Sequence, residues 1–157
     1  MPKFGKVNYK ELEKFAKKIE KSAELTDEFF EKASKELAAR LLALVIPNTP
    51  SDDGVLRRGW TVSSHEDAEN NPGTPTVNEQ KEYVDGLTVA NNGGIFEIEV
   101  ANHVVHALYR EWGHVTRDRK KWVEGSFMLF IAEGDLETEL PRILKKKMEE
   151  FLKGALK

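Results

Sequence analysis

The apolar positions in the first third of the chain recur at helical spacing and predict two N-terminal helices. The first is expected over residues 8–21, where the Asn8 side chain could accept a hydrogen bond from a free amide of the first turn. The second is expected to begin at Thr26, which is followed by two acidic residues that the helix dipole favours, and to be stopped by Pro47. The apolar stripe of this second helix consists of Phe30, Ala33, Leu37, Leu41, Leu44 and Val45.

The middle of the chain contains segments with the two-residue period of a strand. We expect strands over residues 56–64, 83–90 and 95–101. The last two are expected to form a hairpin whose turn is the Asn-Asn-Gly-Gly run at residues 91–94, because Asn and Gly tolerate a positive φ angle. The buried face of the third strand is expected to carry Phe96, Ile98 and Val100, which alternate with glutamates.

Two polar segments rich in proline, asparagine and glycine are predicted to be loops, at residues 47–56 and 65–80. Structureless segments as long as the second are uncommon in compact domains unless they are functional or disordered. We expect both loops to be mobile.

The last third of the chain predicts one short and one long element. Residues 103–112 are expected to form a short helix or an irregular turn that ends at Gly113, and Trp122 begins a short strand or extended segment. Ser126 is expected to cap a long C-terminal helix, with a kink or break between residues 134 and 141. The apolar stripe of this helix consists of Leu136, Leu140, Ile143, Leu144, Met148, Phe151 and Leu152.

This order of elements predicts an α+β fold. In it, an antiparallel sheet of three to four strands packs against two N-terminal helices and a long C-terminal helix. The chain has 157 residues, the length of one ordinary domain, so residues 1–157 are treated as a single domain.

Composition narrows the function classes. The chain has no cysteine, which excludes disulfides, zinc–thiolate sites and a cysteine nucleophile. The formal net charge of -3 gives no reason to expect broad nucleic-acid binding. The N-terminus has no apolar segment of the signal-peptide type, and the apolar run at residues 41–46 is too short to span a bilayer. We therefore expect a soluble intracellular protein with no membrane partner.

Two clusters of residue types offer candidate chemistry. His103, His106 and His114, with Glu111 nearby, are ligand types for a metal ion, although their spacing matches no HExxH pattern. A metal-dependent enzyme built on these four residues therefore remains the third alternative. The sequence contains no nucleophile elbow, phosphate-binding loop or dinucleotide-binding fingerprint. We expect no catalysis, no metal site and no cofactor.

The basic loop at residues 117–121 is the second cluster, and it lies between Trp112 and Trp122. Basic residues interleaved with aromatic ones could contact a nucleic acid, so a binding module that uses Arg117, Arg119, Lys120 and Lys121 is the second alternative. Contact with a protein partner is the better functional interpretation, because Trp and Arg are enriched at interface hot spots.

Three short blocks of the sequence, in this order, resemble motifs of a phage protein family. The first is Asn48-Thr49-Pro50 with the GVLRRGW run at residues 54–60. The second is residues 102–104 with the YREWGH run at residues 109–114, and the third is the WVEGSFML run at residues 122–129. The family is that of the neck, tail-completion and minor tail proteins of lambdoid and related siphophages.

The resemblance implies a structural subunit at the phage head–tail junction, without catalytic activity. Such subunits form rings by self-association and contact connector or tail proteins, and weak contact with the DNA that passes through the neck is compatible with that role. The protein would reside in the host cytoplasm during assembly and then in the virion. A ring requires two different patches on each subunit. The residues expected to contribute to them are Arg57, Arg58, Tyr109, Trp112, His114, Arg117, Arg119 and Trp122.

Overall fold

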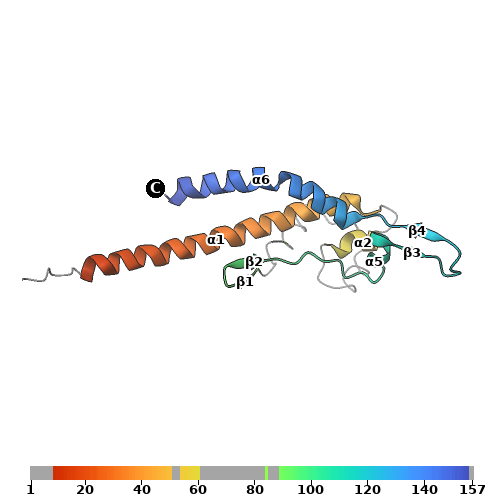
Figure 1. Ribbon diagram of the computed structural model, residues 1–157, viewed down its shortest axis with the longest axis horizontal. Helices are drawn as coiled ribbons and strands as arrows, with labels where there is room; N and C mark the ends of the chain where they lie inside the picture. Colours follow the sequence, from red (N-terminus) through yellow and green to blue (C-terminus); the bar gives the residue numbers. More distant parts are fainter. Residues whose placement is uncertain (1–8, 51–53, 61–83, 85–88, 156–157) are drawn as a thin grey trace, which may run out of the picture.

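Two long helices dominate the computed structural model, which describes residues 9–50, 54–60, 84 and 89–155. Helices α1 (Tyr9–Asn48) and α6 (Met128–Ala155) lie side by side and run in opposite directions (Figure 1). The N-terminal part of α1 extends beyond the C-terminal end of α6 (Figure 1). The remaining described elements are α2 (Gly54–Gly59), β1 (Ala90–Asn92), β2 (Ile95–Glu97), α5 (Ala107–Trp112), β3 (Gly113–Val115) and β4 (Trp122–Glu124).

The N-terminal region forms one continuous helix, so the prediction of two helices is wrong. The residues between the two predicted helices include neither glycine nor proline, and Thr26 therefore lies inside α1 rather than capping a new helix. The helix ends one residue after Pro47, close to the predicted stop. Asn8, the predicted cap, lies outside the described residues.

The hydrophobic core lies where the C-terminal half of α1 meets the N-terminal part of α6. Leu42, Leu56 and Met128 are fully buried there, and they come from α1, α2 and α6 respectively. The other buried members of this cluster are Val45, Ile46, Trp60, Val84, Val104 and Ala132. The core therefore forms between helices, with the intervening segments packed along one side.

The strand predicted over residues 56–64 is wrong for its described part, which is helix α2 and the turn that follows it. A half-buried strand would bury alternate residues, whereas Arg58, Gly59 and Trp60 are buried consecutively. Helix α2 also takes residues 54–56 from the predicted loop at 47–56. Residues 51–53 and 61–64, and the whole loop predicted at 65–80, lie outside the described residues.

Hydrogen bonds fasten α2 to its neighbours on both sides. The Thr49 hydroxyl donates to the Val45 carbonyl at 2.9 Å and accepts from the Trp60 indole at 3.0 Å. On the other side, the side-chain amide of Asn102 donates to the backbone carbonyl of Leu56 at 2.8 Å. All these groups are buried or partly buried, so each bond satisfies a polar atom that water does not reach freely.

The predicted hairpin is present at residues 90–97, and its turn lies within the predicted segment. Gly93 and Gly94 form the turn with φ angles of 65° and 91°, and Ala90 pairs with Glu97. The strand predicted over 83–90 is wrong in its bounds, since β1 begins only at Ala90, and residues 83 and 85–88 lie outside the described part. The strand predicted over 95–101 is too long, since β2 ends at Glu97. The predicted alternation of burial is present, because Phe96, Ile98 and Val100 are half-buried and the residues between them are exposed.

The prediction of a three- to four-stranded sheet is wrong for the described residues, where each of the two sheets has two antiparallel strands. The β1–β2 hairpin packs on α1 through Phe96, whose ring stacks on Phe30 with centroids 5.4 Å apart. The β3–β4 hairpin instead follows α5 directly. Because α1 and α6 bury their apolar faces against each other, the core does not need the face of a larger sheet. The α+β class itself is confirmed.

A kink or a break is predicted between residues 134 and 141, and the break is absent, since α6 runs through Gly134 and Pro141 without interruption. The helix changes direction along its length in Figure 1. Pro141 has no backbone N–H, and the Thr138 hydroxyl donates to the Gly134 carbonyl at 3.0 Å. Both features favour bending over straight helix geometry.

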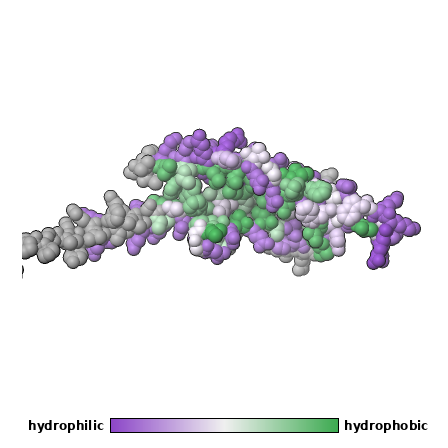
Figure 2. Space-filling model, in the orientation of Figure 1, coloured by the Kyte–Doolittle hydropathy of each residue, from purple (hydrophilic) through white to green (hydrophobic). Residues whose placement is uncertain are grey.

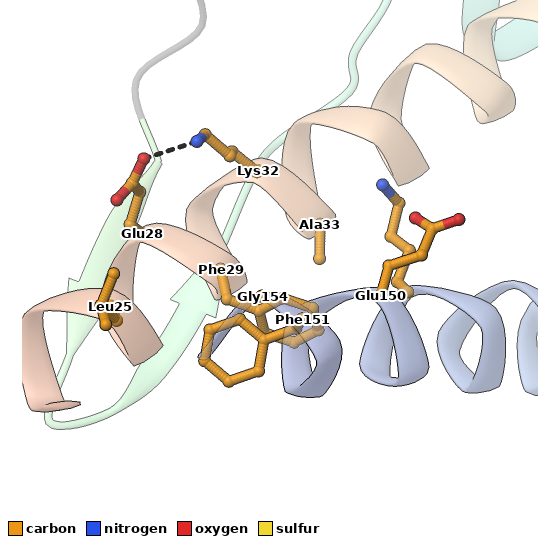
Figure 3. Close-up of a pocket in the computed structure, with 9 residues that line it drawn as sticks. Leu25, Glu28, Phe29, Lys32, Ala33, Glu150, Phe151 and Gly154 are labelled. Atoms are coloured by element: carbon orange, nitrogen blue, oxygen red, sulfur yellow. Dashed lines mark hydrogen bonds and ion pairs between the residues drawn. The ribbon is translucent and has the colours of Figure 1, made fainter. Parts of the chain in front are cut away.

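Beyond the core, α1 and α6 enclose a groove of about 380 Å³ near the C-terminus of α6 (Figure 3). The Phe29 and Phe151 rings meet there with centroids 4.7 Å apart. Leu25 also lines this groove. In the described part of the chain, no helix combines the length and the apolar content that crossing a membrane requires.

A charged contact also joins the two long helices. Glu36 of α1 forms ion pairs with Arg40, at 2.9 Å, and with Lys147 of α6. Burial alone would raise the pKa of the Glu36 carboxyl, but hydrogen bonds and charge from Lys147 and Arg40 outweigh burial and lower the pKa below 4.5.

We expect Glu36 to make folding stability depend on acid. Because its pKa is lowered in the folded state, its contribution is present above pH 4.5 and is lost as the pH falls through the folded value. Glu36→Gln should lower the free energy of unfolding by up to about 1 kcal/mol at neutral pH, a small value because the ion pairs are partly exposed. The difference from the natural protein should shrink as the pH falls, since the Glu36 carboxyl is then protonated. Urea denaturation over a pH series measures this. Glu31→Gln is the control, since the Glu31–Lys35 pair lies within α1 alone; equal pH profiles for the two variants would contradict the prediction.

Candidate interaction surface

A single carboxylate joins α5 to the start of α6. Glu111, in the last turn of α5, is only 8% exposed. Its two oxygens accept hydrogen bonds from the backbone amides of Leu129 and Phe130, each at 3.0 Å. These amides belong to the first turn of α6, where backbone donors have no partner within the helix. A negative charge at this position also interacts favourably with the helix dipole.

The backbone completes this junction. The amide of Ser126 donates to the Arg110 carbonyl at 2.6 Å, and that of Phe127 donates to the Glu111 carbonyl at 3.1 Å. The last carbonyls of α5 thus receive partners from the segment that leads into α6. The prediction that Ser126 caps the C-terminal helix is wrong, because α6 begins at Met128 and its capping carboxylate comes from α5.

Two glycines allow the chain to approach itself closely at the junction. Gly113 ends α5, as predicted, with a φ angle of 87°. A Cβ atom at Gly113 would lie 2.5 Å from the Val123 carbonyl oxygen, and one at Gly125 would lie 2.3 Å from the Glu111 carbonyl oxygen. Neither position has room for a side chain without a backbone shift.

Three aromatic rings gather on the outside of this junction and form what we call the aromatic cluster: Trp112, Phe127 and Phe130. Their ring centroids lie 6.0–6.5 Å apart. Trp112 is 53% exposed and Phe130 is 61% exposed. Large apolar side chains that are packed together yet open to water mark a surface for contact with another molecule.

An apolar groove of about 360 Å³ lies beside the aromatic cluster. Its lining includes Val104, Leu108, Trp112, Phe130 and one exposed acid, Glu133. In Figure 2, hydrophobic residues reach the end of the molecule that carries β3 and β4, and a hydrophilic tip projects beyond them.

The projecting tip is the turn between β3 and β4, residues 116–121, called the basic tip below. Strand β4 confirms the short strand predicted at Trp122, whereas β3 was not predicted. The Thr116 amide donates to the Lys121 carbonyl at 2.8 Å, and the Asp118 carboxylate accepts from the Thr116 hydroxyl and the Lys120 amide. The hydrogen bond from Thr116, followed by that from Lys120, lowers the pKa of Asp118. These hydrogen bonds stabilise the turn that carries the basic residues.

Six of the eight residues predicted at an interface lie in α5, β3, β4 and the basic tip: Tyr109, Trp112, His114, Arg117, Arg119 and Trp122. The other two lie in α2. Arg58 is buried within the subunit, at 4% exposed, and Arg57 is half-buried and donates to the Thr49 carbonyl at 2.8 Å.

The histidines do not assemble with Glu111. His103 and His106 are exposed and precede α5, while His114 lies in β3 with its ring 5.8 Å from that of Tyr109. Within the described residues, no three His, Asp or Glu side chains come together in a way that could hold a metal ion. Both oxygens of the Glu111 carboxylate accept hydrogen bonds from backbone amides of α6. The geometry thus gives the metal-enzyme alternative no support.

Sequence reasoning missed the structural role of Glu111 and the exposure of Leu108 and Phe130. One signal for Phe130 was present: residues 127–132 are all apolar, and a helix that packs on one side cannot bury every one of them. No local signal pointed to Glu111, because it lies 18 residues before the amide that it caps.

An α+β subunit with an open apolar groove, an aromatic cluster and an ordered basic tip belongs to the class of proteins that act by contact with other macromolecules. The comparison with protein families agrees with that class. The family model described as "Bacteriophage HK97-gp10, putative tail-component" matches residues 13–113, which is more than half of the chain.

The chain therefore belongs to this family of phage tail components, and the resemblance noted in the sequence is confirmed. The family is one of structural virion proteins, which work in contact with other virion proteins. No curated protein and no solved structure matches the chain significantly.

We expect the Glu111 carboxylate to contribute measurably to the free energy of unfolding. Glu111→Ala leaves two partly buried amides without an acceptor and should lower the free energy of unfolding by about 1–3 kcal/mol. Glu111→Gln retains one acceptor oxygen and should cost less. Urea denaturation measures both, and hydrogen exchange at Leu129 and Phe130 should be faster in the alanine variant.

The matched control is Glu124→Ala, which removes an exposed glutamate from neighbouring β4. A Glu111→Ala variant as stable as this control, with unchanged exchange at the two amides, would show that the cap contributes nothing.

Proposed function

We propose that this chain is a neck or tail-completion subunit at the phage head–tail junction. In this proposal it acts by self-association into a ring and by contact with connector or tail proteins. The observation that carries the proposal is the concentration of exposed aromatic and basic side chains at one end of a subunit from a tail-component family.

The composition of that end supports protein contact. Trp112 and Trp122 are more than half exposed. Tyr109 is also exposed, and in α5 it directly follows the groove residue Leu108. Trp, Tyr and Arg dominate the binding energy of protein interfaces, because they bury a large area and also form polar contacts. The proposed interface consists of Tyr109, Trp112, His114, Arg117, Arg119 and Trp122.

The proposal also assigns the chain a role without catalysis and without a cofactor. The acid nearest the three histidines in sequence, Glu111, uses both carboxylate oxygens to hold α5 to α6. The subunit would be made in the host cytoplasm and then incorporated into the neck or tail. Weak contact with the DNA in the neck is compatible with this proposal.

Nucleic-acid binding as the main activity is less well supported. The basic tip has four basic residues and one acid, Asp118. The first half of α6, however, carries four acids. These are Glu133, Asp135, Glu137 and Glu139, and their charges would repel a phosphate backbone.

Deletion of the gene from a phage that encodes this chain tests the proposal. We expect DNA-filled heads and tail tubes to accumulate unjoined, because a subunit at the junction acts after heads are filled and tail tubes have formed. Electron microscopy of the lysate distinguishes the products, and a wild-type copy supplied in trans is the control. Normal virions, or a failure of the tail tube itself to form, would contradict a role at the junction.

A further inference from the structure

The basic tip and the apolar groove are two different surfaces of one subunit. The basic charge of the tip is complementary to the acidic first half of α6, which contributes Glu133 to the groove. We propose that the basic tip of one copy docks into the apolar groove of a second copy, against the acidic first half of α6. The inference rests on the self-association proposed above and names the two surfaces that meet.

Charge is the first argument. The basic tip has four basic side chains and one acid, whereas residues 128–141 of α6 have four acids and no base. Both sets are exposed to solvent. Within the acidic set, Glu133 lines the groove itself, so a docked tip would bring opposite charges together at the groove.

Apolar area is the second argument. Val115 and Trp122 face each other across the β3–β4 hairpin at the base of the tip, and both are at least half exposed. The groove offers Leu108, Trp112 and Phe130 as apolar lining. Burying these two surfaces against each other would remove apolar area from water on both sides.

Order in the free subunit is the third argument. The hydrogen bonds of Thr116 and Asp118 already stabilise the turn before docking. Little conformational entropy would therefore be lost from this turn on docking. The tip also projects from the end of the molecule (Figure 1), so a second copy can reach it.

The contact joins two different surfaces, so a copy can give its tip to one neighbour and its groove to another. Such a contact is heterologous, and only the two end copies keep a free tip or a free groove until the ring closes. This contact can generate the ring that the proposed function requires.

Cysteine cross-linking tests the inference directly, because the natural chain has no cysteine. One copy carries Lys120→Cys in the tip and a differently tagged copy carries Glu133→Cys at the groove. We expect a mixed disulfide-linked dimer at several times the yield of a control pair, Lys120→Cys with Lys146→Cys. Lys146 is also exposed on α6 but lies in its basic C-terminal half.

Charge reversal provides an independent test by sedimentation. Lys120→Glu/Lys121→Glu and Glu133→Lys/Glu137→Lys should each weaken self-association by on the order of tenfold. An equimolar mixture of the two variants should recover it, since reversed tips then meet reversed grooves. The control for the tip variant is Lys145→Glu/Lys146→Glu, which makes the same change in net charge as that variant on exposed residues outside both surfaces.

The outcomes separate the inference from the proposed function. If the chain self-associates but the cross-link stays at the control level, the tip–groove contact is refuted and the junction role stands. If the cross-link and the charge rescue succeed but deletion leaves virions normal, the contact stands and the junction role fails. Binding of a DNA duplex that the tip reversal abolishes, without any cross-link above control, would assign the tip to nucleic acid and overturn the inference.

Discussion

The hydrogen bonds from the first turn of α6 to the Glu111 carboxylate are the interaction on which the outer end of this molecule depends. The carboxylate supplies acceptors and a negative charge to a helix start that has no local capping side chain. These hydrogen bonds also fix α5 relative to α6. The segment between them passes so close to the Glu111 carbonyl at Gly125 that a side chain there would not fit. The aromatic cluster and the basic tip are both attached to this junction.

The three sequence blocks that resemble the phage family turn out to be connected in space. Trp60 of the first block bonds to Thr49 of the same block, and Asn102 of the second block bonds to the carbonyl of Leu56 in the first. Glu111 of the second block caps the helix that the third block begins. The motifs thus describe a chain of internal hydrogen bonds that organises the fold, rather than a set of reactive groups.

This arrangement separates stability from recognition. The core between α1 and α6 is apolar and helical, and the Glu36–Lys147 pair adds a charged contact between the same helices. The exposed side chains of Trp112 and Trp122 and the basic tip lie together at one end, on short elements held by hydrogen bonds. A structural virion protein needs this separation, because its contact surfaces must stay open to partners while the subunit itself remains folded.

The sequence by itself determined the features that depend on local chemistry. The α+β class, the helix stop near Pro47, the Asn-Asn-Gly-Gly hairpin, the end of α5 at Gly113 and the family all followed from residue types and short-range spacing. Helical period and turn chemistry act over a few residues, so they can be recognised without a structure.

Only the tertiary structure decided which surfaces were buried and which long-range partners met. The run at 56–60 became a buried helical turn, because it packs against residues more than 40 positions away, such as Asn102. The cap of α6 came from Glu111 instead of Ser126, and Arg58 lay inside the subunit while Phe130 lay outside. The free energy of burial and of hydrogen bonding depends on what surrounds a side chain in space, and neighbours in sequence do not specify those surroundings.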